Sequence, residues 1–208
     1  MTPSGWRPEL SGELKVRPAG EADILGVTRM LASAFQDEPA MSFIFPVPEV
    51  RRARLPGFFK VIYQSDYPSG ACYVTGQGEA ATIWQAPGHG YLSWLEKIRL
   101  AWPWISESRM ALGRALTYSA ASDANRPKEP HWYLHIAGCA PSKQGKGFGS
   151  AAIRAGLARC DLDGVAAYLE TSTESNLVIY ESLGFVTTHE WAVKNGPRCW
   201  SMFRSKRV

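Results

Sequence analysis

The sequence predicts a mixed α/β protein whose strands form a single sheet with helices between them. Two observations support this fold class. Short runs rich in β-branched and aromatic residues alternate with segments whose apolar residues recur every three or four positions. No internal repeat or low-complexity segment interrupts that order, and 208 residues are enough to bury the core of one domain. We therefore expect a single domain over residues 14–208, after a loose N-terminal arm at residues 1–13.

The N-terminal half is expected to alternate between strands and helices. Apolar residues on one helical face indicate the first helix, and three prolines then break the chain before the second. Gly76-Gln77-Gly78 is a turn sequence between two strand-like runs, which predicts a hairpin. The expected elements are a strand at 14–17, helices at 20–36 and around 55–62, strands at 71–75 and 80–85, and an aromatic, helix-like insert at about 90–125.

The C-terminal half continues the same alternation. Thr171 and Glu174 have the spacing of a capping box, which predicts that a helix opens there, and Gly184 is suited to end it. The expected elements are a strand at 131–139, a helix at about 147–160, a strand at 165–170, a helix ending at Leu183, and closing strands near 185–190 and 198–203.

Composition narrows the class of protein. Hydrophobic residues make up 45% of the chain and charged residues 20%, as in ordinary globular proteins. The net charge of +4 mildly favours an anionic ligand, but the basic residues are scattered, so we expect no nucleic-acid partner. No apolar run is long enough for a membrane span, and the first residues lack a signal-peptide pattern. The four cysteines show no metal-ligand spacing, which predicts free thiols in the cytoplasm and no metal site.

A glycine-rich turn between the strand at 131–139 and the following helix is the strongest local motif. Residues 144–149 read Gln-Gly-Lys-Gly-Phe-Gly, and such a turn offers several backbone N–H donors beside the positive end of a helix dipole. That arrangement suits a diphosphate. The Walker pattern is excluded because Gly147, not Ser or Thr, follows Lys146. The dinucleotide pattern is excluded because Ser150 stands where its third glycine is needed.

Further motifs extend this pattern over residues 126–204, and a weaker patch covers residues 16–40. They include Leu169-Glu170-Thr171-Ser172, Asn176, Tyr180-Glu181-x-Leu183-Gly184-Phe185, Gly196-Pro197-Arg198-x-Trp200-x-Met202 and, in the second patch, Ala34-Phe35-x-Asp37-x-Pro39-Ala40. With these motifs the chain resembles the GCN5-related N-acetyltransferase superfamily, and more narrowly the puromycin N-acetyltransferase group. The resemblance implies a splayed, mostly antiparallel sheet that holds acetyl-CoA in a V-shaped gap and transfers its acetyl group to an amine.

The resemblance also implies which residues hold acetyl-CoA. Main-chain groups at the end of the strand would pair with pantetheine, the loop amides would wrap the diphosphate, and Asn176 would add a contact. The strand-end residues are Cys139, Ala140 and Pro141, and those of the loop are Gln144, Gly145, Lys146, Gly147, Phe148, Gly149 and Ser150.

Acetyl transfer from a thioester needs an uncharged amine and a proton for the departing thiolate. The family places its proton-donating tyrosine at the position of Tyr180, one helical turn after Asn176. The base stays open between His135, Tyr133 and Glu170, or an ordered-water relay. His131, Tyr133 and His135 alternate along their strand and should share one face. The puromycin enzyme has small or apolar residues at these two histidine positions, which argues for a different acceptor.

The acceptor site is expected to involve Trp84 as an aromatic wall, with Phe35 and Asp37 in the loop where this superfamily meets its acceptor. An acetyl-cysteine intermediate on Cys139 is disfavoured because the sequence shows no activating partner. We therefore expect direct attack by a primary amine of a small molecule, with antibiotic-like amines compatible. The alternatives are a protein or peptide acetyltransferase and a non-catalytic acyl-CoA sensor. A homodimer is compatible with the sequence.

Overall fold

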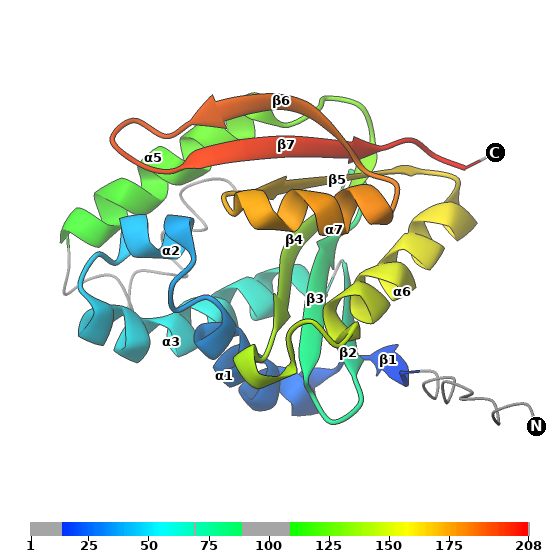
Figure 1. The fold of residues 1–208 in the computed structure, drawn as a ribbon, viewed down its shortest axis with the longest axis horizontal. Helices are drawn as coiled ribbons and strands as arrows, with labels where there is room; N and C mark the ends of the chain where they lie inside the picture. The colour runs from blue at the N-terminus through cyan, green and yellow to red at the C-terminus, as the bar shows by residue number, and fades with distance from the viewer. Residues whose placement is uncertain (1–13, 69, 89–108, 208) are drawn as a thin grey trace, which may run out of the picture.

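The computed structural model describes residues 14–68, 70–88 and 109–207, and these residues contain one seven-stranded sheet in the order β1-β2-β3-β4-β5-β7-β6 (Figure 1). Only β4 and β5 run parallel, whereas the other neighbouring pairs are antiparallel. The predicted mixed, mostly antiparallel sheet is therefore confirmed. The strands are β1 (Val16–Pro18), β2 (Ala71–Thr75), β3 (Ala80–Gln85), β4 (His131–Cys139), β5 (Ala166–Thr171), β6 (Val186–Ala192) and β7 (Arg198–Arg204).

Helices cover both faces of the sheet (Figure 1). Three short 3₁₀ turns, η1 (Glu21–Asp23), η2 (Pro141–Lys143) and η3 (Glu174–Asn176), join them to the strands. The helices are α1 (Ile24–Ala34), α2 (Pro39–Ile44), α3 (Pro48–Asp66), α5 (Arg109–Asn125), α6 (Phe148–Asp163) and α7 (Leu177–Ser182). In the described part of the chain, no helix is long and apolar enough to span a membrane.

The prolines after α1 start helices instead of only breaking the chain. Pro39 and Pro48 are the first residues of α2 and α3, where the missing proline N–H has no helical carbonyl to reach. Pro56 lies inside α3, which is much longer than the predicted helix around 55–62. A proline signal alone could not distinguish a helix start from a break.

The predicted capping box at Thr171 is wrong. Thr171 is the last residue of β5, and its hydroxyl accepts a hydrogen bond from the Thr173 amide at 3.2 Å. This local turn uses the threonine oxygen before any helix begins, so the helical segment starts at Glu174 in η3. Of the predicted insert at 90–125, residues 109–125 form α5, and the remainder lies outside the described residues, as does the predicted arm at 1–13.

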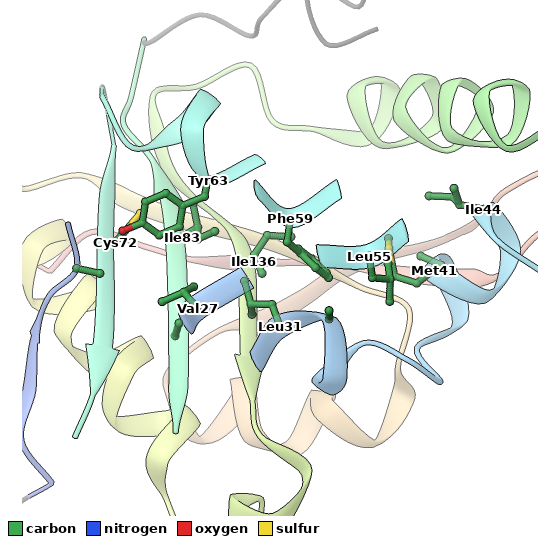
Figure 2. Close-up of a cluster of buried hydrophobic side chains, with 14 of the residues drawn as sticks. Val27, Leu31, Met41, Ile44, Leu55, Phe59, Tyr63, Cys72, Ile83 and Ile136 are labelled. Atoms are coloured by element: carbon green, nitrogen blue, oxygen red, sulfur yellow. The ribbon is translucent and has the colours of Figure 1, made fainter. Parts of the chain in front are cut away.

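Two hydrophobic clusters fill the two faces of the sheet. The first packs α1 and α3 against β2, β3 and β4, with Leu31, Phe59 and Ile83 fully buried (Figure 2). The second lies under α6 and α7 and contains Trp84, which is also fully buried. A Cβ atom on Gly156 of α6 would lie 2.1 Å from the Trp84 ring, so this glycine lets the indole fit beneath the helix.

A β-bulge in β4 determines where the sheet opens. Ile83 pairs with Ile136 while the next residue, Trp84, pairs with Leu134, so His135 is an extra residue in β4. The parallel pairing of β4 with β5 ends at the same place, with Leu134 opposite Leu169. Beyond it, β4 continues along β3, and β5 continues along β7. The two strands therefore separate at the bulge, as the resemblance implied.

Candidate active site

The end of β4 leads directly into the glycine-rich loop. The Ala140 amide donates to the Glu79 carbonyl at 2.8 Å, which holds the strand end against the β2–β3 hairpin. The Gln144 side chain then folds back, with Nε2 donating to the Cys139 carbonyl at 3.3 Å. These two bonds fix both ends of the turn that contains η2.

Two glycines shape the loop itself. Gly145 and Gly147 have φ angles of 72° and 83°, a region that side chains with a Cβ atom rarely adopt. Gly147 is the N-cap of α6, and the first hydrogen bond within that helix is donated by Ala151 to the Gly147 carbonyl at 2.9 Å. The amides of residues 148–150 therefore lack helical partners. They lie at the positive end of a 16-residue helix, and this donor set fits a diphosphate.

Tyr180 lies on α7, which follows Asn176 at the end of η3. Its ring is buried in the second cluster and packs edge-on against Phe185, with 6.2 Å between ring centroids. Burial, and after it the negative charge of Glu38, raise the pKa of Tyr180 to about 12. The phenol therefore keeps its proton throughout the neutral pH range, which a proton donor requires.

Glu38 lies in the loop between α1 and α2, and its carboxylate points toward α2 and the end of β5. Sequence reasoning missed this residue. One of its oxygens accepts from the Met41 amide at 2.8 Å, which caps α2, and the other accepts from the Ser172 hydroxyl just after β5. The neighbouring Asp37, which the sequence favoured, is exposed. An acidic residue directly before the helix-starting Pro39 is an N-cap pattern that could have revealed Glu38.

His135 contacts a buried carboxylate on α3. Its Nδ1 lies 2.6 Å from Asp66 Oδ2, and the Asp66 side chain is only 5% exposed. The imidazole stacks on Tyr133 with 5.2 Å between ring centroids. His131, Tyr133 and His135 share one face of β4 as predicted, because Tyr168 contacts both His131 and Tyr133.

The other two predicted base candidates, Glu170 and Tyr133, lie near one another on neighbouring strands. Glu170 accepts from the Ser122 hydroxyl at 2.6 Å and from the Tyr168 hydroxyl at 2.8 Å, which ties α5 to β5. Burial and the charge of Glu170 raise the pKa of Tyr133 far above its usual value. Tyr133 is therefore protonated at neutral pH, and a neutral phenol is a poor base.

The structure separates the predicted acceptor residues. Trp84 lies in the core beneath α6 and has no exposed surface, whereas Phe35 lies at the end of α1 on the opposite cluster. The Phe35 ring packs on Phe59 with 5.0 Å between centroids and lies beside Gly138 of β4. β4 pairs with β5 only as far as Leu134, and of these two aromatic residues only Phe35 lies beside the part of β4 that follows.

An open groove of about 520 Å³ lies between α2, α5 and the β6–β7 turn. The groove is lined by Ser42, Phe43, Pro46, Gly113, Arg114, Thr117, Lys194 and Asn195.

Comparisons with known proteins bear on the fold. The chain matches no model of a known protein family. It is 25% identical over 167 residues to an uncharacterized N-acetyltransferase of Schizosaccharomyces pombe, covering 75% of this chain and 68% of that protein. It is similar to a solved structure from Corynebacterium glutamicum named histone acetyltransferase HPA2 and related acetyltransferase, with a TM-score of 0.72, 24% identity and coverage of 94% and 98% of the two chains. It is also similar to arylalkylamine N-acetyltransferase 2 from Aedes aegypti, with a TM-score of 0.61, 14% identity and coverage of 92% and 98%.

At these identities the solved structures establish the fold, which is that of the GCN5-related N-acetyltransferases. The curated relative and the structural neighbours all point to that family, and their names support an acyltransferase. The narrower likeness to the puromycin group stays a prediction.

Replacing Gly147 by valine should weaken the binding of CoA by about tenfold or more. A β-branched residue costs about 1–2 kcal/mol in the left-handed region, so the loop would shift and turn its amides away from one another. Isothermal titration calorimetry with CoA measures the change.

Gly164 provides the matched control, because it has a φ of 63° at the other end of the same helix. Gly164→Val should lower the melting temperature but leave the dissociation constant of CoA unchanged. If Gly147→Val binds CoA as tightly as the unmodified protein, the loop does not hold the diphosphate.

Proposed function

We propose that this protein is an acetyl-CoA-dependent N-acetyltransferase that acts on a primary amine of a small molecule by direct attack in a ternary complex. The observation that carries the proposal is the opening between β4 and β5, which begins at the bulge and lies beside the glycine-rich loop that follows β4. An unpaired strand edge next to a cluster of helix N-terminal amides suits a long ligand with both amide and diphosphate groups.

Acetyl-CoA would lie along the end of β4 and across the loop. Main-chain groups of Cys139, Ala140 and Pro141 would pair with the pantetheine amides, the amides from Gln144 to Ser150 would hold the diphosphate, and Asn176 would add a side-chain contact. When bound, acetyl-CoA supplies the activated acetyl group. Burial raises the pKa of the Cys139 thiol, which disfavours a covalent acetyl-cysteine and supports direct transfer.

Two proton transfers would then involve side chains of this protein, one as donor and one as acceptor. Tyr180 holds a proton on its hydroxyl and would release it where a thiolate leaves. His135 would take a proton from the amine, since imidazole accepts protons near neutral pH. Glu38 replaces Asp37 in this scheme as the anchor for the incoming ammonium, because its carboxylate lies close enough to Tyr180 to affect that group's pKa.

The acceptor is proposed to be a small amine because the acetyltransferase neighbours include an arylalkylamine enzyme. A puromycin-like or other antibiotic-like amine is compatible with the sequence resemblance. We also propose a cytoplasmic location, on the grounds of four unpaired thiols.

The proposed function is tested by measuring thiol release from acetyl-CoA over a panel of amines. Arylalkylamines, polyamines, aminonucleosides and a lysine-containing peptide should be compared at equal concentration, with mass spectrometry to locate the acetyl group. We expect one small-amine class to release thiol at least tenfold faster than the peptide. Preference for the peptide supports the protein-acetyltransferase alternative. Tight CoA binding without release over any amine supports the sensor alternative.

Tyr180→Phe should lower kcat by tenfold or more and leave the affinity for CoA nearly unchanged, since general acid catalysis typically contributes 10²–10⁴-fold. Tyr63→Phe is the matched control, because it deletes a buried phenol that donates to the Gly20 carbonyl at 2.9 Å, away from the gap. The control should lose about 1 kcal/mol of stability and keep its kcat. An unchanged kcat in Tyr180→Phe would remove this residue from the mechanism.

Glu38→Gln should raise the KM for the amine by about tenfold with a smaller effect on kcat, since a charge-assisted hydrogen bond contributes about 1.5–3 kcal/mol. Asp37→Asn, one residue away and exposed, should leave the KM unchanged. Steady-state kinetics at saturating acetyl-CoA decide between the two carboxylates. A raised KM in Asp37→Asn alone would restore Asp37 as the anchor.

A further inference from the structure

Because His135 lies on the bulge, its imidazole contacts a residue of α3. In a regular strand, successive side chains alternate between faces, yet His135 contacts Asp66 on α3 and the next residue, Ile136, packs in the same α1–α3 cluster. The extra residue therefore lets two consecutive side chains turn toward α3. It also places the imidazole where β4 leaves β5, at the entrance of the gap.

One carboxylate holds the Nδ1 side of this imidazole, and Gln85 holds that carboxylate. Asp66 Oδ2 lies 2.6 Å from Nδ1, and Gln85 Nε2 donates to the other Asp66 oxygen at 2.9 Å. Gln85 Nε2 also lies 3.2 Å from Nδ1, but both atoms are donors once Nδ1 carries the hydrogen, so the shorter contact with Asp66 decides the tautomer. Because a carboxylate oxygen only accepts, this geometry places the imidazole hydrogen on Nδ1. Nε2 then carries the lone pair, and it has no hydrogen bond to any residue that the structure describes.

Asp66 and His135 differ in how much of each side chain is exposed to solvent. The Asp66 side chain is 5% exposed, whereas that of His135 is 24% exposed. The carboxylate thus lies behind the ring, away from solvent, and the imidazole keeps an accessible edge. Tyr133 stacks on the ring with an interplanar angle of 26° and limits its rotation. A buried acid behind a partly exposed histidine is the arrangement that orients a base.

From this geometry we propose that Asp66 is a positioning residue that fixes the tautomer and orientation of His135, so that Nε2 accepts the proton of the attacking amine. Gln85 holds Asp66 in place for that role. The proposal rests on the proposed acetyltransferase function. In the step, an N–H bond of the ammonium would break, with the proton going to Nε2 and the electron pair staying on nitrogen. As that pair forms the N–C bond to the thioester carbon, the C–S bond would break and the departing thiolate would take the proton that Tyr180 holds. The second proton that the nitrogen then loses would restore the phenol. Asp66 then faces an imidazolium and stabilises its charge.

The titratable and charged groups around the pair are Cys72, Tyr133 and Arg126. Burial and the charge of Asp66 raise the pKa of Cys72 on β2 to about 12. Burial and the charge of Glu170 raise the pKa of Tyr133 on β4 well above its usual value, and the guanidinium of Arg126 lies 4.0 Å from the centroid of that ring. Cys72 and Tyr133 are therefore neutral, and Arg126 keeps its positive charge at every pH of interest.

The first test compares Asp66→Asn with the unmodified protein over pH 5–9 in kcat/KM, using one amine for both. The amine's own ionisation then contributes equally to both profiles. Loss of the carboxylate removes the partner of the imidazolium, so the acid limb should move to lower pH by about one unit or more. The plateau should fall about tenfold or more, because the tautomer is no longer fixed. In a His135→Gln background, Asp66→Asn should have no further effect on kcat.

Asp161→Asn is the matched control. This acid pairs with the buried guanidinium of Arg204 at 2.8 Å on another part of the sheet. It should lower the melting temperature without moving the acid limb. An unchanged limb and plateau in Asp66→Asn, or full additivity with His135→Gln, would overturn the proposal. A loss that only follows the folded fraction in both aspartate variants would also overturn it.

A second measurement separates this proposal from the proposed function. Long-range ¹H–¹⁵N NMR distinguishes the two neutral histidine tautomers, and the chain has only four histidines to assign. His135 should carry its hydrogen on Nδ1 in the unmodified protein and lose that preference in Asp66→Asn. If the unmodified protein acetylates no amine but shows this tautomer, the acetyltransferase function fails and the Asp66 contact stands. A hydrogen on Nε2 in the unmodified protein overturns the positioning role whatever the activity.

Discussion

The separation of β4 from β5 beyond Leu134 and Leu169 is the constraint on which the rest of the site depends. A parallel pair normally satisfies its backbone groups along its whole length, so two strands that diverge leave an edge for another partner. Here the divergence coincides with the extra residue at His135, which shifts the register against β3. One local irregularity therefore exposes the strand edge and presents the imidazole at that edge.

The opening also explains how groups from both faces of a sheet can serve one reaction. Tyr180 belongs to the cluster beneath α6 and α7, whereas Glu38 and His135 are held by α2 and α3 on the other face. An intact sheet would keep these groups apart. After burial, the charge of Glu38 is the second cause of the raised pKa of Tyr180, so a carboxylate on one side of the sheet acts on a phenol on the other. In the proposed mechanism, the proton donor and the proton acceptor therefore lie on opposite sides of the sheet.

Local sequence predicted the parts of this site that depend on local chemistry. Glycines at 145 and 147 are needed wherever a turn requires positive φ, and alternation along β4 correctly placed Tyr133 and His135 on one face. The bulge was not predictable, because its register is defined by pairing with Ile83 and Trp84 of a distant strand. Asp66 is 69 positions from His135 and carries no motif. Trp84 was assigned to the acceptor site because nothing in its own neighbourhood shows that Gly156 leaves space for it in the core.

The two hydrogen bonds accepted by Glu38 connect the start of α2 to the end of β5, beside the gap. Its two oxygens already serve the first turn of α2, through the Met41 amide, and the chain just after β5, through Ser172. If Glu38 anchors the ammonium as proposed, the cation would share these oxygens, and its arrival would alter the stability of the six-residue α2, which forms one wall of the groove. By thermodynamic reciprocity, anything that stiffens or loosens α2 changes how tightly the cation is held. Substitutions along α2 that never touch a ligand can therefore change affinity.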